Sequence, residues 1–333
     1  MKEVHVSAPG SLMLLGEHAV LDGNQAVISA INRRIHVSLL PIHNHRILKI
    51  ESRLGEYESN LDNLNEDNRF RFILKAVHLT ADKLRTGIHL KIHSDFPSSI
   101  GFGSSTAVTV AVHAALEKYI KGEIPDSLSL FHSSLNTIRH TQKWASGADV
   151  AASVYGGLIG YMNEGNSLLS EQDPTNPSIT FTNQRIPMTA VFCGYKKPTH
   201  EVINEVIFKQ TTSHSDILKK FKFSEINSIA KKGLEALQKN KLAVFGDHMN
   251  QQQKIMYDVG LSTSELDEIY NTLIKDSAIS GAKISGAGLG DCVVAIGHPS
   301  EEEGDIHETI LLNKTYPLYK LHVETIGCSE TNL

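Results

Sequence analysis

A glycine- and serine-rich loop at residues 97–107, PSSIGFGSSTA, constrains the fold more than any other feature of this sequence. It follows the segment 88–92, in which apolar and polar residues alternate, a pattern that predicts a strand. After the loop the apolar spacing becomes helical and predicts a helix from about 105 to 121, ended by Gly122. A strand, a glycine-rich loop and a helix in this order indicate a mixed α and β fold.

The same loop has the composition of a phosphate-binding site. Gly101 and Gly103 allow the backbone to turn sharply and approach a ligand, while Ser104 and Ser105 place hydroxyl groups beside the positive end of the following helix. The loop matches neither G-x-x-x-x-G-K-[ST] nor G-x-G-x-x-G. A plain strand-to-helix turn with a serine N-cap is the alternative interpretation, and the loop alone leaves both open.

Three further runs could carry chemistry. ISGAKISGAGLGDCV at 279–293 is glycine-rich, SGAD at 146–149 places an aspartate at the start of an apolar segment, and APGSLMLLGEHAVLDG at 8–23 contains the polar pair Glu17 and His18 in an apolar stretch. Taken singly, a glycine-rich hairpin, a helix N-terminal charge and a hairpin turn are the simpler interpretations. The functional interpretation depends on their combination.

Composition and charge argue against several classes of function. A net charge of −5 with mixed signs does not favour a nucleic-acid or anionic-membrane partner. The three cysteines follow no metal or redox spacing, and no stretch approaches the ~18 apolar residues of a spanning helix, so we expect a cytoplasmic protein. Among 17 histidines only His43 and His45 form a tight pair, which is weak support for a metal-dependent hydrolase.

The length of 333 residues predicts two domains. Residues 163–184 are rich in Asn, Ser, Pro and Gly and predict a surface loop or a crossing between lobes, so we place one domain at 1–175 and the other at 176–333. Other patterns predict strands at 35–39 and 292–296, and helices at 66–79, 199–208, 225–239, 242–258 and 264–275, the last with a capping-box signal at 262–265.

Taken together and in this order, the four runs resemble the GHMP kinase superfamily of galactokinase, homoserine, mevalonate and phosphomevalonate kinases. APG-x₅-GEHAV and the stretch 245–262 are most similar to mevalonate kinases, whereas HTQKWASGADVAASVYGG and SGAGLGDC look closer to phosphomevalonate kinases. The resemblance covers most of the chain. It implies a two-domain α+β fold, with an N-terminal ribosomal-protein-S5-like α/β domain, a C-terminal ferredoxin-like domain, and ATP with Mg²⁺ in the cleft between them. It also implies a homodimer.

The resemblance also implies roles for individual residues. Asp149 would be the catalytic aspartate that accepts or orients the proton of the attacking hydroxyl, with Ser11 beside it in the catalytic group. Ser105 would be the Mg²⁺ ligand. The residues expected to bind ATP are Pro97, Ser99, Gly101, Phe102, Gly103, Ser104 and Ser105. The residues expected to bind the acceptor are Glu17, His18, Ser146, Gly286 and Ala287.

Three positions depart from the family pattern. Ser11 stands where mevalonate kinases usually have lysine, Ser99 where glycine is common, and Asn136 near the position of an acidic Mg²⁺ ligand. A phosphorylated acceptor would need cations, for which the candidates are Lys143, Lys196, Lys197 and Lys283. The resemblance implies mevalonate as the acceptor, with 5-phosphomevalonate second. The departure at Ser11 keeps a third hypothesis open, a non-catalytic ATP-binding regulator with the same fold.

Overall fold

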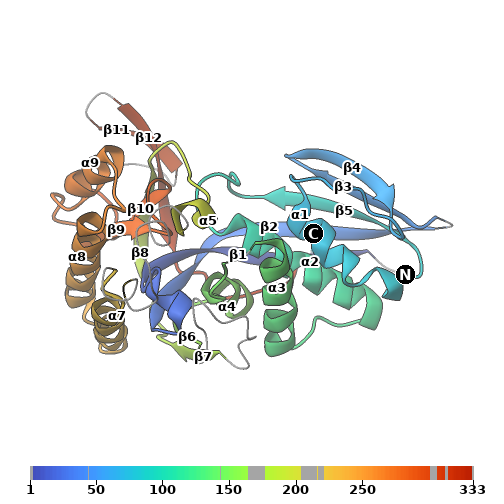
Figure 1. Cartoon of the computed structure of the whole chain (residues 1–333), viewed down its shortest axis with the longest axis horizontal. Coiled ribbons are helices and arrows are strands. Elements are labelled where there is room, and N and C mark those ends of the chain that lie inside the picture. The colour runs from blue at the N-terminus through green and yellow to red at the C-terminus, as the bar shows by residue number, and fades with distance from the viewer. Residues whose placement is uncertain are drawn as a thin grey trace.

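The computed structural model describes residues 3–43, 45–142, 144–163, 177–203, 216, 221–300, 306–311 and 314–331. Within these ranges the chain forms two sheets, each with helices packed against it, at opposite ends of an elongated molecule (Figure 1). Among the described helices none is long and apolar enough to span a membrane.

The first sheet has eight strands in the order β13-β1-β2-β5-β3-β4, with β6 paired to β2 and β7 to β6. All pairs are antiparallel except β3 with β5. The strands are β1 (Val4–Leu15), β2 (Ala26–Ile42), β3 (Ile47–Ser52), β4 (Gly55–Asn60), β5 (Gly87–Ser94), β6 (Leu158–Met162), β7 (Ser178–Phe181) and β13 (Ser329–Glu330). Helices α1 (Arg71–His78), α2 (Ser104–Lys121), α3 (Ser127–Thr141) and α4 (Ala148–Tyr155) accompany it, with 3₁₀ turns η1 (Ala19–Asp22) and η2 (Ala81–Lys83).

The elements predicted in this half are confirmed, with one shorter helix. The predicted strands lie in β2 and β5, which pair with Val37 opposite Ile92. α2 ends at Gly122, whose φ of 92° is left-handed, as expected of a glycine C-cap. The helix predicted from residue 66 begins only at Arg71. The preceding residues form a separate turn, in which the Asp67 carboxylate accepts from Arg69 N at 2.9 Å.

The second sheet has five antiparallel strands in the order β11-β12-β8-β10-β9. Its strands are β8 (Pro187–Phe192), β9 (Gly281–Ser285), β10 (Cys292–Ile296), β11 (Ile306–Leu311) and β12 (Lys314–His322), and its helices are α5 (Thr199–Val202), α7 (Phe223–Gln238), α8 (Leu242–Asp258) and α9 (Ser264–Leu273). The predicted strand at 292–296 and three of the predicted helices are confirmed. α9 is capped by Thr263, whose hydroxyl accepts from Leu266 N at 3.5 Å. Of the predicted helix 199–208, the part from 204 lies outside the described residues.

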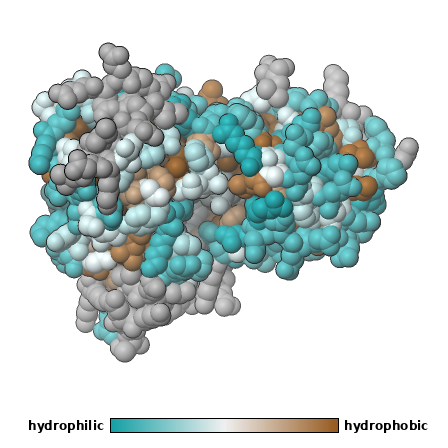
Figure 2. Space-filling model, turned by 90° about the horizontal axis from the view of Figure 1, so that it is seen from above, coloured by the Kyte–Doolittle hydropathy of each residue, from teal (hydrophilic) through white to brown (hydrophobic). Residues whose placement is uncertain are grey.

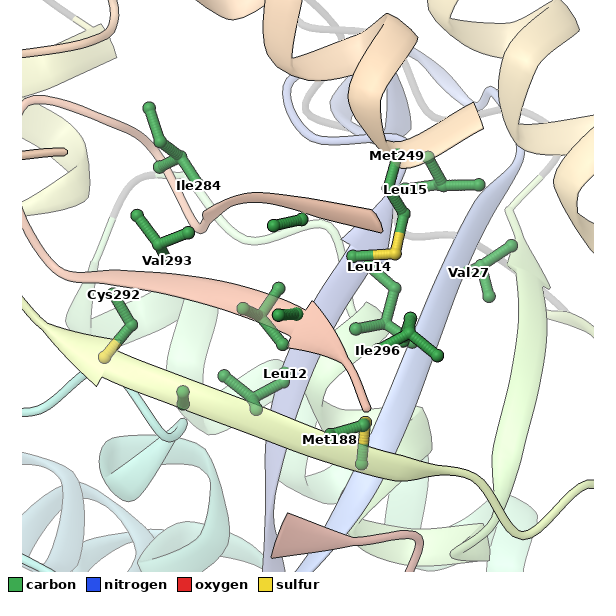
Figure 3. Close-up of a cluster of buried hydrophobic side chains, with 14 of the residues drawn as sticks. Leu12, Leu14, Leu15, Val27, Met188, Met249, Ile284, Cys292, Val293 and Ile296 are labelled. Atoms are coloured by element: carbon green, nitrogen blue, oxygen red, sulfur yellow. The ribbon is translucent and has the colours of Figure 1, made fainter. Parts of the chain in front are cut away.

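The chain changes sheets between β7 and β8, and β13 returns from the C-terminal end to pair with β1. Most of the predicted loop 163–184 lies outside the described residues, so the division into 1–175 and 176–333 stays a prediction. The two sheets share one hydrophobic cluster. In it Leu12, Leu14 and Leu15 of β1 lie among side chains of the second sheet and of α8 (Figure 3).

This shared cluster makes β1 a common element of both domains. Each of its leucines is at most 1% exposed, and full burial of such a side chain contributes roughly 1.5–3 kcal/mol. Because these leucines are buried against both sheets, the end of β1 is held between the two domains. The turn that follows it carries Glu17 and His18. The outer face seen in Figure 2 is mostly hydrophilic, with hydrophobic residues in separate patches.

Candidate active site

The loop before α2 presents the start of that helix as an anion-binding surface. Gly101 and Gly103 have φ values of 75° and 66°, in the left-handed region that glycine adopts without strain. α2 begins at Ser104 with Gly103 as its N-cap. The first backbone N–H groups of a helix have no partner within it, so this end suits a phosphate. The serine N-cap of the alternative interpretation is wrong, because the Ser104 hydroxyl donates to Ser98 O at 3.2 Å instead.

Asp149 lies in the first turn of α4 and is held by Ser11 of β1. The Ser11 hydroxyl donates to Asp149 Oδ1 at 2.7 Å, and Ser11 N donates to Phe102 O at 3.1 Å. Ser11 also packs against the phosphate loop, since a Cβ added to Gly103 would lie 2.4 Å from its hydroxyl oxygen. One serine therefore joins the predicted catalytic carboxylate to the predicted phosphate loop. The sequence marked both residues, but not the bond between them.

The protonation of Asp149 is set by competing effects. Burial raises the pKa of Asp149, while the Ser11 hydrogen bond and the charge of Lys196 lower it. The burial effect is the largest, so this carboxylate holds a proton more readily than an exposed aspartate does. A carboxylate with a raised pKa is better suited to take a proton from an attacking hydroxyl.

A pocket of about 140 Å³ opens beside Asp149. All five residues predicted to bind the acceptor line this one pocket together with Asp149. They are Glu17, His18, Ser146, Gly286 and Ala287. The pocket therefore gathers three separate runs of the sequence: the turn after β1, the segment that leads into α4, and the turn between β9 and β10.

Besides lining this pocket, Glu17 joins the two domains. Its two carboxylate oxygens are both occupied by residues of the second domain: Lys283 Nζ contacts Oε1, and Gln252 Nε2 donates to Oε2 at 2.6 Å. Burial raises the pKa of Glu17 and lowers that of Lys283, and their mutual attraction opposes both shifts. Lys283 is fully buried, so it is neither a solvated surface charge nor a cation that a substrate can reach. The pair joins the domains at the edge of the pocket.

His18 enters the pocket as a neutral side chain. Burial lowers the pKa of His18 to about 4. Its Nε2 lies 2.9 Å from Ala287 O, and because a carbonyl can only accept, Nε2 carries the proton and Nδ1 is left as an acceptor. The backbone of His18 has φ of 61°, a left-handed value that costs a residue other than glycine about 1–3 kcal/mol. Such strain is concentrated at functional sites, which is consistent with the pocket position.

A second and larger pocket, of about 560 Å³, begins at the phosphate loop. Four of the loop residues predicted to bind ATP line it, namely Pro97, Ser99, Ser104 and Ser105. The rest of its lining includes Arg53, Asn68, Arg69 and Phe72, which sequence reasoning missed. Arg53 follows β3, Asn68 and Arg69 precede α1, and Phe72 lies in α1, so no spacing relates these residues to the loop. A volume of this size accommodates a small-molecule ligand such as a nucleoside.

Phe102 is the one predicted ATP-binding residue whose side chain has a clear structural role. It is 1% exposed, and its ring packs against Phe96 and Tyr319 at centroid distances of 5.7 and 5.2 Å. It therefore anchors the loop to the core. Only its backbone remains for a ligand, and its carbonyl already accepts from Ser11 N.

Another carboxylate, the partly buried Asp291, also borders the phosphate loop. A Cβ added to Gly101 would lie 1.7 Å from Asp291 Oδ1, so this loop position accepts only glycine. Lys196 Nζ lies 3.4 Å from Asp291 Oδ2. Burial raises the pKa of Asp291, and Lys196 lowers it. The sequence singled out Lys196 only as one of four possible cations. Another of the four, Lys143, lies outside the described residues.

A metal site made only of protein ligands is absent from the described part of the chain, where no three His, Cys, Asp or Glu side chains group suitably. Mg²⁺ ordinarily keeps several waters and takes one or two protein oxygens together with substrate phosphates. Ser105, at the first turn of α2 and at the edge of the larger pocket, fits that requirement. Asn136 does not line either pocket.

Comparison with known proteins identifies the family. Residues 71–157 match the model described as GHMP kinases N terminal domain, and residues 234–310 match GHMP kinases C terminal. The mevalonate kinase of Archaeoglobus fulgidus is 31% identical over 292 residues, which cover 87% of this chain and 91% of that protein. The chain belongs to the GHMP kinase family. The mevalonate kinase of Aeropyrum pernix is 25% identical over 318 residues, covering 93% of each chain.

Solved structures of GHMP kinases share the fold. The mevalonate kinase of Methanococcus jannaschii aligns over 99% of both chains with a TM-score of 0.73 and 21% identity. The phosphomevalonate kinase of Streptococcus pneumoniae, in complex with phosphomevalonate and AMPPNP, aligns over 90% of this chain and 93% of that one, with a TM-score of 0.72 and 20% identity. The predicted two-domain GHMP kinase fold is thus confirmed. The chain is a small-molecule kinase of a family whose phosphate donor is ATP.

Proposed function

We propose that this GHMP kinase transfers the γ-phosphoryl group of ATP to the hydroxyl of mevalonate, giving 5-phosphomevalonate and ADP. The observation that carries the proposal is the position of Asp149. It lines the acceptor pocket and is joined through Ser11 to the phosphate loop. A hydroxyl bound in that pocket would lie between a carboxylate and the loop that receives the triphosphate.

The chemistry requires mainly positioning and charge stabilisation. The acceptor oxygen attacks the γ-phosphorus, the bond to the β,γ-bridging oxygen breaks, and ADP leaves. Asp149 accepts or orients the proton of the hydroxyl, and Ser11 holds the carboxylate in place. The first turn of α2 binds phosphate oxygens, and the larger pocket beside it is the proposed nucleoside site. Mg²⁺, when held with ATP at Ser105, would neutralise phosphate charge.

The described lining of the acceptor pocket favours an acceptor without a phosphate group. It contains no lysine or arginine, and its polar side chains other than Glu17 and Asp149 are neutral: Thr106, Gln142, Trp144, Ser146 and His18. Neutral donors can bind a hydroxyl or a single carboxylate. A phosphate ester is normally recognised by cations, so this lining supports mevalonate over 5-phosphomevalonate. Mevalonate kinases among the relatives support the same choice.

A coupled ADP-release assay over mevalonate, 5-phosphomevalonate, homoserine and galactose tests the proposal. Turnover with mevalonate well above the other three is the expected result. Turnover with 5-phosphomevalonate alone would transfer the proposal to the second acceptor, which the SGAGLGDC run favours. Turnover with none of the four, together with heat of binding for ATP, would instead support the non-catalytic regulator.

A further inference from the structure

Two partly buried carboxylates border the phosphate loop. Asp291 touches it at Gly101, and Asp149 reaches it at Gly103 through Ser11. Residues two positions apart in a chain lie within about 7 Å of each other, so both carboxylates border the same short stretch. A triphosphate arriving there would add negative charge to a site that already holds two acids. A cation must offset that charge, and Ser11 is neutral.

Asp291 has a strained backbone, and the charge of its carboxylate is only partly compensated. Its backbone has φ of 78°, a left-handed value that glycine would adopt without strain. Its Oδ1 is buried and has no hydrogen-bond partner among the described residues. The charge of Asp149 raises the pKa of Asp291 further. The compensating contact is the ion pair of Oδ2 with Lys196.

Lys196 lies close enough to both carboxylates that border the phosphate loop for its charge to act on them. In the described part of the chain it is the only lysine or arginine that forms an ion pair with either carboxylate, and its charge also lowers the pKa of Asp149. Its backbone segment is tied to the glycine-rich turn, since Asp291 N donates to Tyr195 O at 2.9 Å and Cys193 N donates to Asp291 O at 3.0 Å. The Lys196 side chain is 36% exposed, so its ammonium can exchange Asp291 for an incoming anion.

We propose, building on the kinase activity proposed above, that Lys196 contacts the transferred phosphoryl group and supplies the positive charge that stabilises the transition state. Asp291 is a positioning residue. It holds the ammonium beside Gly101 while the site is empty of nucleotide, and it yields the ammonium to the γ-phosphate when ATP binds. The source of the cation is thus the loop after β8 in the second domain, not β1, where Ser11 lies.

Lys196→Met tests the role of the charge, with Lys254→Met as the matched control. Lys254 is a lysine of the same domain, 76% exposed on α8 and paired only to Asp258 among the described residues. We expect Lys196→Met to lower kcat by on the order of 10²-fold, the effect of removing one transition-state donor. Lys196→Arg should recover part of the loss, and Lys254→Met should match the wild type.

Binding provides a readout that does not depend on turnover. Calorimetry with Mg²⁺ and either ADP or a non-hydrolysable ATP analogue gives the ratio of the two dissociation constants. Because the contact is to the γ-phosphate, Lys196→Met should weaken the analogue by roughly tenfold and leave ADP nearly unchanged, about the effect of one charge-assisted contact. Asp291→Asn, which releases the ammonium without removing it, should keep the preference for the analogue and lower kcat less than Lys196→Met does.

Two results would overturn the inference. One is a Lys196→Met variant whose kcat and whose ratio of dissociation constants both stay within about twofold of the wild type. The other is equal weakening of ADP and the analogue, which would indicate a general effect on nucleotide binding. Far-UV circular dichroism checks the fold, and Lys196→Gln replaces the methionine variant if that one does not fold. A wild type that releases no ADP with any acceptor would refute the proposed function, while the binding ratio would still decide the role of Lys196.

Discussion

Replacing Lys283 with methionine tests the buried ion pair that joins the two domains beside the acceptor pocket. The side chains of Lys283 and Glu17 are 0% and 3% exposed. Besides Glu17, the ammonium contacts the carbonyl of Ile284, and the other Glu17 oxygen accepts from Gln252. Methionine fills a similar volume without charge. Glu17 would keep one amide donor and lose its counter-charge.

The expected cost follows from this burial. Removing one partner of a buried ion pair typically destabilises a protein by about 3–5 kcal/mol, because the remaining charge stays uncompensated. No solvent screening reduces that value here, since both groups are buried. We therefore expect the free energy of unfolding of Lys283→Met to fall by about 4 kcal/mol, a large part of the ~5–15 kcal/mol that stabilises a typical protein.

A double variant distinguishes two causes of the loss: the uncompensated charge on Glu17 and the changed packing around residue 283. In Glu17→Gln with Lys283→Met no charge remains, and Gln252 can still donate to the new amide. Replacing both partners of a buried pair is often neutral or stabilising. The double variant should therefore lose less than half the sum of the two single losses, which a double-mutant cycle measures directly.

Urea unfolding followed by far-UV circular dichroism and by the fluorescence of the single tryptophan, Trp144, is the assay. The pH dependence adds a second check. An unpaired Glu17 would have its folded pKa raised still further above 4.5, and a raised acid pKa gains stability as pH falls. The difference in free energy of unfolding between the wild type and Lys283→Met should thus become smaller as the pH falls from about 7 to about 5. A loss below about 1 kcal/mol, or a double variant equal to the sum of the singles, would refute the reasoning.

Three further predictions concern single residues. Asp149→Asn should lower kcat by ~10²–10⁴-fold and leave the calorimetric affinity for an ATP analogue close to that of the wild type; unchanged turnover would remove Asp149 from the mechanism. Ser105→Ala should raise the Mg²⁺ concentration needed for half-maximal ADP release, and an unaltered titration would exclude a ligand role. Burial lowers the pKa of His113 to about 4, where it bonds Thr137. A histidine whose pKa is lowered in the folded state destabilises the protein as the pH falls below the pKa of the unfolded state, about 6.5. Between about pH 7 and about pH 5 the free energy of unfolding of the wild type, measured in urea, should therefore fall by about 2 kcal/mol more than that of His113→Gln. Parallel losses in the two proteins would contradict this.

Local sequence patterns predicted most of the described α-helices but only three of the strands, β2, β5 and β10. Alternation predicted β5, and helical spacing predicted α2 and α8, because burial of one face of a strand or helix imposes its period on the sequence. β10 was recognised instead as a short apolar run. Where a local interaction ended an element, the prediction depended on recognising it. Gly122 marked the end of α2 correctly, whereas the turn at Asp67 was missed and α1 was predicted too long.

The residues predicted to bind the acceptor were chosen on different grounds. Glu17, His18, Ser146, Gly286 and Ala287 line one pocket, but no spacing relates the three runs that carry them. They were found through the ordered resemblance to a family. Its match now extends over most of the chain.

What the sequence by itself determined is therefore most of the described helices, a few of the strands and the family. Only the tertiary structure decided which charges meet. Glu17 pairs with Lys283 across 266 positions and Ser11 bonds Asp149 across 138, while Asp291 lies on Gly101 and holds Lys196. The physical reason is that an ion pair or hydrogen bond leaves no periodic mark on the chain. It depends on where folding brings two side chains and on how much water that position excludes.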